Sequence, residues 1–247
     1  MAFLSINFYS QEVLRTDAEF YVILPNNVKP PYKTVYLLHG LENDHTTWMR
    51  LTSIERYAND RGLAIVMPNV ERSFYTDMHH GRKFYTYVSQ ELIDYTRMIL
   101  PLSTKREDTF IAGFSMGGYG AYKIAFRNYE KFGAVASMSG ALDMGSGTLV
   151  EEMGDEMELI YGDMSKFYGS DEDLFHLTDK LVEEKKLDLR IYQAIGTSDY
   201  LYSDNQRFKE MIETKGFDYT YEESEGDHMW DYWDRTIPRV LDFFLEK

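Results

Sequence analysis

Residues 113–117 read Gly-Phe-Ser-Met-Gly, a G-x-S-x-G pattern with a serine at its centre. This pattern can hold a serine hydroxyl on a sharp turn between a strand and a helix, where it can act as a nucleophile. The context favours that interpretation, because a β-prone run at 109–112 precedes the pattern and a helix-like run at 119–127 follows it. We therefore expect Ser115 to be a nucleophile held in a strained backbone conformation.

A serine hydroxyl is a weak nucleophile at neutral pH, so it needs a neighbouring base, and the base needs an acid that fixes its tautomer. His228 is the candidate base, because it lies in the turn 225–230 between the last predicted strand and the last predicted helix. An isolated histidine in a polar loop would more often be a surface residue. The serine pattern upstream reverses that preference, since such a loop can bring an imidazole over Ser115.

The acid that we favour is Asp199, because it follows a predicted strand in Gly196-Thr197-Ser198-Asp199. In open α/β sheets, groups that face ligands gather beyond the carboxyl ends of the strands. The competitor is Asp143, which also follows a predicted strand, and Asp199 or Asp204 could instead only cap the next helix. The chain order of serine, acid and histidine is the one found in α/β-hydrolases.

The negative oxygen that forms during acyl transfer needs two aligned hydrogen-bond donors. The residue after the nucleophile supplies one, so we assign the backbone N–H of Met116. The loop after the third predicted strand supplies the other, and the backbone N–H of Leu41 is our choice because Gly40 lets the chain turn tightly. His39 precedes the serine in sequence, so we expect it to hydrogen-bond the loop backbone rather than to act as the base.

Glycine is frequent at the start of the helix that follows the serine. Gly117, Gly118 and Gly120 mark this start, and a glycine within a helix costs about 1 kcal/mol relative to alanine. Three such residues indicate a steric demand, which predicts that this helix packs closely against the sheet behind the nucleophile.

Strand-like and helix-like runs alternate along the chain, and the first two strands are close enough to form a hairpin. The strand candidates are 4–9, 20–24, 34–38, 63–67, 109–112, 133–137, 189–194 and 219–222, and the helix candidates are 47–59, 88–100, 119–127, 174–185, 202–214 and 230–245. The order predicts one mostly parallel eight-stranded sheet with helices on both faces, in a single α/β domain spanning 1–247. The stretch 142–173 fits least well and is either a lid over the site or a long surface excursion.

Composition excludes several classes of protein. The 247 residues contain no cysteine, which excludes disulfides, a thiol nucleophile and cysteine-bound metal. The formal charge of −15 is uneven, since residues 1–140 carry +1 and residues 141–247 carry −16. A nucleic acid would be repelled by the second half. We attribute this acidity to solubility, although it could also disfavour anionic substrates.

Other sequence features indicate no cofactor and no membrane insertion. There is no phosphate-binding or dinucleotide-binding pattern and no apolar run of about 18 residues. Residues 1–10 lack the features of a signal peptide, so we expect a cytoplasmic location. The polar groups 77–80 and 171–173 could suggest metal sites, but loops are the better interpretation. Aromatic residues at 73–87 could line a pocket or pack at a sheet edge.

Five motifs in order resemble the esterase D family, and the bacterial tributyrin esterases are the nearest branch. They are Leu37-Leu38-His39-Gly40 with Trp48, Phe74-Tyr75-Thr76-Asp77, the run 113–121, Gly196-Thr197-Ser198-Asp199 and Gly226-Asp227-His228-Met229-Trp230. The resemblance implies an α/β-hydrolase fold, carboxylesterase activity on short acyl esters, and a triad of Ser115, Asp199 and His228. The family also includes S-formylglutathione hydrolases, feruloyl and acetylxylan-type esterases, and mycolyl transferases.

We therefore expect a serine carboxylesterase that cleaves small acetyl or butyryl esters, possible substrates being acetylated sugars and feruloyl esters. A thioesterase or an acyltransferase on the same fold is the alternative, and a non-catalytic binding protein is a third hypothesis. The expected partner is a small-molecule ester, and self-association into a homo-oligomer is plausible.

Overall fold

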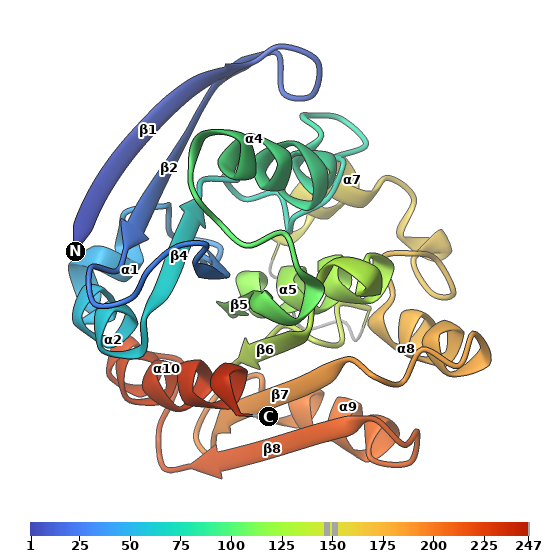
Figure 1. The fold of residues 1–247 in the computed structure, drawn as a ribbon. Coiled ribbons are helices and arrows are strands. Elements are labelled where there is room, and N and C mark those ends of the chain that lie inside the picture. Colours follow the sequence, from blue (N-terminus) through green and yellow to red (C-terminus); the bar gives the residue numbers. More distant parts are fainter. Residues whose placement is uncertain (146–148, 150–152, 247) are drawn as a thin grey trace.

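A single sheet runs through the whole molecule, which we describe from a computed structural model covering residues 1–145, 149 and 153–246. The strand order across the sheet is β1-β2-β4-β3-β5-β6-β7-β8. The β1–β2 hairpin lies at one end of the sheet and β8 at the other (Figure 1). The strands are β1 (Ala2–Ser10), β2 (Thr16–Leu24), β3 (Lys33–Leu38), β4 (Leu63–Pro68), β5 (Thr109–Phe114), β6 (Ala134–Met138), β7 (Arg190–Gly196) and β8 (Asp218–Ser224).

The strand pairings confirm a mostly parallel sheet. β1 and β2 form the expected antiparallel hairpin, and β2 also pairs antiparallel with β4. Every pairing from β4 across to β8 is parallel. All residues of β4, β5 and β6 are buried, as expected for parallel strands that helices cover on both faces.

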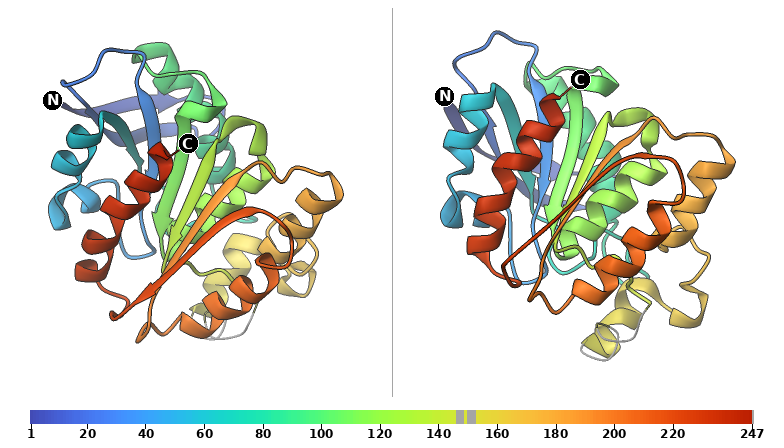
Figure 2. Two further views of the ribbon diagram at one scale, coloured as in Figure 1. Left: turned by 60° about the horizontal axis from the view of Figure 1, so that its bottom comes forward. Right: turned by 90° about the horizontal axis from the view of Figure 1, so that it is seen from below.

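Helices cover both faces of the sheet (Figure 2). They are α1 (Thr47–Leu51), α2 (Ile54–Arg61), α3 (Phe84–Thr86), α4 (Leu92–Ile99), α5 (Met116–Arg127), α7 (Asp155–Tyr161), α8 (Leu174–Glu183), α9 (Tyr202–Ile212) and α10 (Trp230–Leu245). The apolar residues of α1, α2 and α10 pack on one face. Those of α4, α5, α8 and α9 pack on the other, so the core is split into two layers by the sheet.

Two helices differ from the sequence prediction. The helix expected over 47–59 is broken between α1 and α2, because the Thr52 hydroxyl donates to the Trp48 carbonyl at 2.6 Å and accepts from the Ile54 N–H at 3.1 Å. The helix expected over 88–100 starts earlier, at Phe84, and passes through a π-helical turn at Tyr87–Glu91 before α4. Side-chain and backbone contacts of this kind leave no periodic signal in a sequence.

The described part of the stretch 142–173 includes α7 and the 3₁₀ turn Met164–Lys166. Its apolar residues Met157, Ile160 and Phe167 are buried in the core. Residues 146–148 and 150–152 lie outside the described residues, so a lid here stays a prediction. Since the sheet takes strands from both ends of the chain, we propose that residues 1–247 form one domain.

Candidate active site

Ser115 lies at the turn between β5 and α5 in the strained conformation expected from its sequence context. Its backbone has φ 53° and ψ −121°, a combination that non-glycine residues rarely adopt. Two hydrogen bonds hold the turn, since the Ser115 N–H donates to the Met138 carbonyl at 3.0 Å and the Ser115 carbonyl accepts from the Ala141 N–H at 3.2 Å. The end of β6 and the loop after it therefore fix the turn that presents the hydroxyl.

The glycines of α5 allow this close packing. A Cβ atom on Gly117 would lie 2.6 Å from the His39 carbonyl oxygen, and one on Gly118 would lie 2.5 Å from the Ser137 hydroxyl oxygen. A Cβ on Gly120 would lie 2.3 Å from the Tyr75 ring. Distances this short are not tolerated, so the steric demand inferred from the sequence is confirmed.

His228 and Asp199 lie in line with the serine hydroxyl. The His228 Nε2 is 3.0 Å from the Ser115 Oγ, and the His228 Nδ1 is 2.9 Å and 3.0 Å from the two carboxylate oxygens of Asp199. An ionised carboxylate can only accept, so Nδ1 carries the proton and the free Nε2 accepts from the Ser115 hydroxyl. This is the tautomer that can take the serine proton.

Two neighbouring loops place the acid against the base. The Ser198 N–H donates to the Gly226 carbonyl at 2.9 Å, and the Asp199 carboxylate accepts from the Leu201 N–H at 2.9 Å. A Cβ on Gly196 would lie 2.4 Å from the Gly226 carbonyl oxygen, so the two loops touch through backbone. Asp199 is buried, and these contacts leave its carboxylate facing the imidazole.

The other candidate acids are engaged elsewhere. Arg207 donates to the Asp143 carboxylate at 2.8 Å and to the Asp204 carboxylate at 2.6 Å. The structure therefore brings Ser115, Asp199 and His228 together and places Asp143 and Asp204 around a different cation.

A pocket of about 310 Å³ opens at the serine. It is mostly apolar and aromatic, and its lining consists of Leu41, Glu42, Asn43, Phe74, Phe114, Ser115, Met116, Ala141, Leu149, Tyr200, His228, Met229, Trp230 and Trp233. Both residues assigned to the oxyanion site, Met116 and Leu41, are in this lining. Met116 is the first residue of α5, where a backbone N–H has no partner within the helix and the helix dipole is positive.

The chain is similar to known esterases and serine hydrolases over almost its whole length. The Esterase family model matches residues 11–244. An acetyl esterase of Caldicellulosiruptor saccharolyticus is 32% identical over 98% of both chains. The substrate-bound structure of the serine hydrolase FphF of Staphylococcus aureus is 38% identical, covers 100% of this chain and 99% of that one, and superimposes with a TM-score of 0.92. The S-formylglutathione hydrolase FrmB of the same organism is 37% identical over 99% of both chains, with a TM-score of 0.89.

The chain belongs to the Esterase family. It is an esterase D-like α/β-hydrolase and a serine esterase, so the resemblance seen in the sequence is confirmed. None of the helices in the described part of the esterase is long and apolar enough to cross a membrane.

His39 of the esterase has the structural environment that its position suggested. Its Nδ1–H donates to the Gly40 carbonyl at 2.8 Å, and its Nε2 accepts from the Val70 N–H at 3.1 Å. Burial lowers the pKa of His39 from 6.5 to about 4, so the ring is neutral at physiological pH. The neutral ring ties the loop that carries Leu41 to the chain after β4.

The polar groups 77–80 and 171–173, which could have suggested metal sites, are engaged in contacts within the protein. Asp77 accepts from the Thr86 N–H at 2.8 Å, and Glu172 forms an ion pair with Lys123 at 2.6 Å. Among residues 1–145, 149 and 153–246, no group of three or more histidine or acidic side chains could hold a metal ion. In the aromatic run 73–87, Phe74 and Tyr75 are both buried, and Phe74 lines the pocket whereas Tyr75 is not part of that lining.

Sequence reasoning missed two parts of the site. Tyr200 and Trp233 flank the His228 ring, with centroids 4.6 Å and 5.0 Å away. Lys123, in the middle of α5, is fully buried, and its partner Glu172 is partly buried. A lysine inside the apolar run 121–126 is the signal that could have indicated this buried cation.

Proposed function

We propose that this esterase hydrolyses short-chain acyl esters, of acetyl to butyryl size, through an acyl-serine intermediate on Ser115. The observation that carries the proposal is the line of hydrogen bonds from the Ser115 Oγ through His228 to Asp199, with distances of 3.0 Å and 2.9 Å, at an apolar pocket. A serine aligned in this way with a base and an orienting acid is the arrangement that acyl transfer requires.

The reaction runs in two halves. His228 takes the Ser115 proton through Nε2 as the serine oxygen attacks the ester carbonyl, and Asp199 stabilises the resulting imidazolium. The imidazolium then gives its proton to the leaving alkoxide, which departs and leaves the acyl group on Ser115. A water molecule that His228 deprotonates attacks the acyl-serine, and return of the proton to the serine oxygen releases the acid.

The oxyanion is stabilised by two backbone donors, Met116 and Leu41. Both residues line the pocket beside the serine, and Met116 adds the positive end of α5. Gly40 supports this role for the loop, because a Cβ there would lie 2.5 Å from the Phe114 ring and would push the loop away from the serine.

The pocket supports a small, neutral substrate. Its volume of about 310 Å³ lies near the lower limit for small-molecule sites, about 300 Å³. The similarity to an acetyl esterase over 98% of both chains points to the same acyl size. Tributyrin as a substrate, acetylated sugars, feruloyl esters and a cytoplasmic location stay predictions.

The decisive experiment replaces the nucleophile. Ser115→Ala should lower kcat for p-nitrophenyl acetate by about 10⁴-fold or more, because the acyl-serine can no longer form. A fluorophosphonate probe should label the wild type and fail to label the variant. Ser137→Ala is the matched control, since this buried serine lies on the neighbouring strand β6 and should keep both activity and labelling. A folded Ser115→Ala variant with near wild-type turnover would refute the mechanism.

A thioesterase is the second candidate, favoured by the similarity to FrmB. Glutathione thioesters carry carboxylates, and Lys and Arg are absent from the described residues that line the pocket, whereas Glu42 is present. A pocket of this charge favours neutral esters. We therefore place ester hydrolysis first and glutathione thioesters second.

A further inference from the structure

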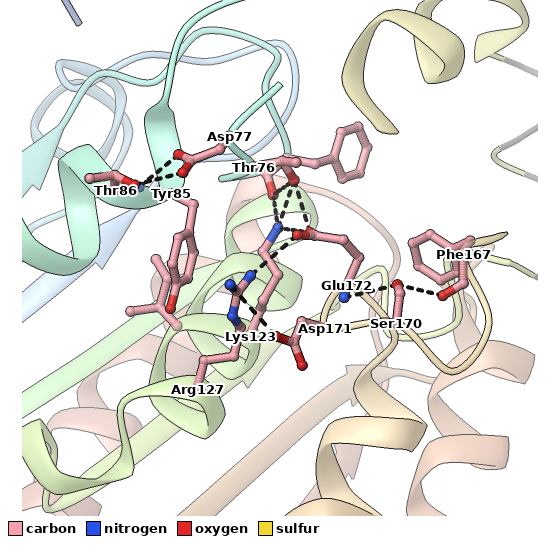
Figure 3. A network of polar contacts seen from close by, with 12 residues as sticks. Thr76, Asp77, Tyr85, Thr86, Lys123, Arg127, Phe167, Ser170, Asp171 and Glu172 are labelled. Carbon is pink, nitrogen blue, oxygen red and sulfur yellow. Dashed lines mark hydrogen bonds and ion pairs between the residues drawn. The ribbon is translucent and has the colours of Figure 1, made fainter. Parts of the chain in front are cut away.

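Lys123 is a buried cation behind the active site. Its side chain is 0% exposed, and it projects from α5, the helix that begins at the nucleophile. Its ammonium donates to the Phe74 carbonyl at 3.0 Å, to the Thr76 hydroxyl at 2.6 Å and to the Glu172 carboxylate at 2.6 Å. A lysine ammonium has three donors, so these contacts use all of them. Figure 3 shows Lys123 pointing between Thr76 and Glu172.

The first of these contacts reaches the wall of the pocket. Phe74 lines the pocket, and both Phe74 and Tyr75 have positive φ, 49° and 52°. Two consecutive non-glycine residues in this region are costly and persist only where the surroundings hold them. Lys123 holds the Phe74 carbonyl, and the Tyr75 hydroxyl donates to the His39 carbonyl at 3.0 Å.

The third contact joins this turn to the chain before α8. Glu172 accepts from Lys123 on one carboxylate oxygen and from Arg127 on the other, at 3.2 Å. The Tyr119 hydroxyl donates to the Glu172 carbonyl at 2.7 Å. Burial lowers the pKa of Lys123 from 10.5 and Glu172 partly offsets this effect, so the resulting pKa is about 8. The ammonium is therefore protonated at neutral pH and keeps its three donors.

We propose that Lys123 is a positioning residue for substrate selection: by holding the Phe74 carbonyl and Glu172 together, it fixes the strained Phe74–Tyr75 turn and thereby the pocket wall that limits the size of the substrate. The proposal rests on the proposed function of the Ser115 pocket. Lys123 is not itself a catalytic residue, because it is fully buried and is not part of the pocket lining. Its effect on the reaction passes through Phe74.

Lys123→Met tests the proposal, because methionine has a similar length and no donors. Glu172 keeps Arg127 as a partner and is 23% exposed, so this variant leaves no isolated buried charge. We expect the freed Phe74 wall to accept larger substrates. In a series of p-nitrophenyl acetate, butyrate and hexanoate, or of acetates with larger alcohols, kcat/KM of the larger ester relative to the smallest should rise about five-fold or more. The change should lie mainly in KM, with fluorophosphonate labelling of Ser115 retained.

The matched control is Arg127→Met, which removes a cation from the same Glu172 carboxylate without touching Phe74. It should leave the size selectivity within two-fold of the wild type while lowering the melting temperature. Thr76→Val is a second test should Lys123→Met fail to fold, because the Thr76 hydroxyl accepts from Lys123 and lies 3.2 Å from both the Phe74 carbonyl and the Glu172 carboxylate, either of which can accept its proton. Its selectivity should change in the same direction as that of Lys123→Met.

Two results would overturn the proposal. In the first, Lys123→Met lowers stability and lowers kcat/KM for every ester by the same factor, which is the signature of a purely structural residue. In the second, Arg127→Met shifts selectivity as much as Lys123→Met does. Either result leaves the proposed function intact, because that fails only if Ser115→Ala stays active.

Discussion

Two histidines near the nucleophile use their ring nitrogens for different purposes. The Nε2 of His228 faces the Ser115 hydroxyl in the pocket, whereas both nitrogens of His39 bond backbone groups in the interior. A base has to exchange protons with substrate and water, so only the histidine that reaches the pocket can serve. His39 instead depends on remaining neutral, since a second proton would remove the acceptor for the Val70 N–H.

The protonation of His39 predicts acid sensitivity of the fold. Burial lowers its pKa from 6.5 to about 4, so between these pH values the unfolded chain binds a proton that the folded chain does not. Stability from this group is therefore fully present above pH 6.5 and is lost as the pH falls toward 4, by about 3 kcal/mol. Urea unfolding measured from pH 4 to pH 8 should show the loss.

The comparison variant for this measurement is His39→Gln, whose free energy of unfolding should vary less steeply with pH in that window. His45 has a lowered pKa through burial as well, so His45→Gln is needed to separate the two contributions. Parallel pH curves for the wild type and His39→Gln would contradict the assignment.

The glycine-rich start of α5 is the element that brings the nucleophile, the oxyanion loop and the Phe74–Tyr75 turn together. Gly117 lets α5 approach the His39 carbonyl, and Gly120 lets it approach the Tyr75 ring. Since three separate segments meet one helix turn, the size of each side chain there affects the geometry of the whole site.

Gly120→Ala should destabilise the protein although it improves helix propensity. Propensity alone would add about 1 kcal/mol of stability. The new Cβ would lie 2.3 Å from the buried Tyr75 ring, and overpacking of this kind typically costs about 1–3 kcal/mol. We expect a lower free energy of unfolding in urea and a lower melting temperature. A more stable variant would show that the ring can move aside and that the steric argument is wrong.

The elements themselves could be predicted well from the sequence, because buried parallel strands are continuous apolar runs and α10 has a clear period. The break between α1 and α2 could not, since it depends on the Thr52 hydroxyl and on the Ser53 N–H donating to Asp234, 181 residues away. The π-helical turn Tyr87–Glu91 could not be predicted either, because local helix propensity does not distinguish it from an α-helix.

The site could be predicted in part for the same reason. Ser115 is marked by its turn, but Asp143 and Asp199 both follow strands, and only the loop contacts with Gly226 bring Asp199 to the imidazole. The Lys123–Glu172 pair joins residues 49 positions apart, so neither residue alone predicts the other.

At the scale of the whole molecule, the active site lies where two differently charged halves of the chain meet. Ser115 and Leu41 belong to residues 1–140, with a formal charge of +1, whereas Asp199 and His228 belong to residues 141–247, with −16. One sheet carries both halves, so the acidic half acts on any substrate that approaches the serine. Such a field favours neutral over anionic substrates.

The negative charge of residues 141–247 predicts that the esterase distinguishes between two thioesters with the same acyl group. The acetyl thioester of N-acetylcysteamine is neutral, and S-acetylglutathione is anionic, so kcat/KM should be higher for the neutral one. Raising the ionic strength from about 0.01 M to about 0.1 M shortens the Debye length from about 30 Å to about 10 Å, which should narrow the gap. Glu42→Gln removes the negative charge at the pocket and keeps the charge of the rest of the molecule, so comparison with the wild type separates the two effects on kcat/KM. Faster turnover of S-acetylglutathione at both ionic strengths would contradict the prediction and favour the thioesterase, because no field of this sign accelerates the approach of an anion.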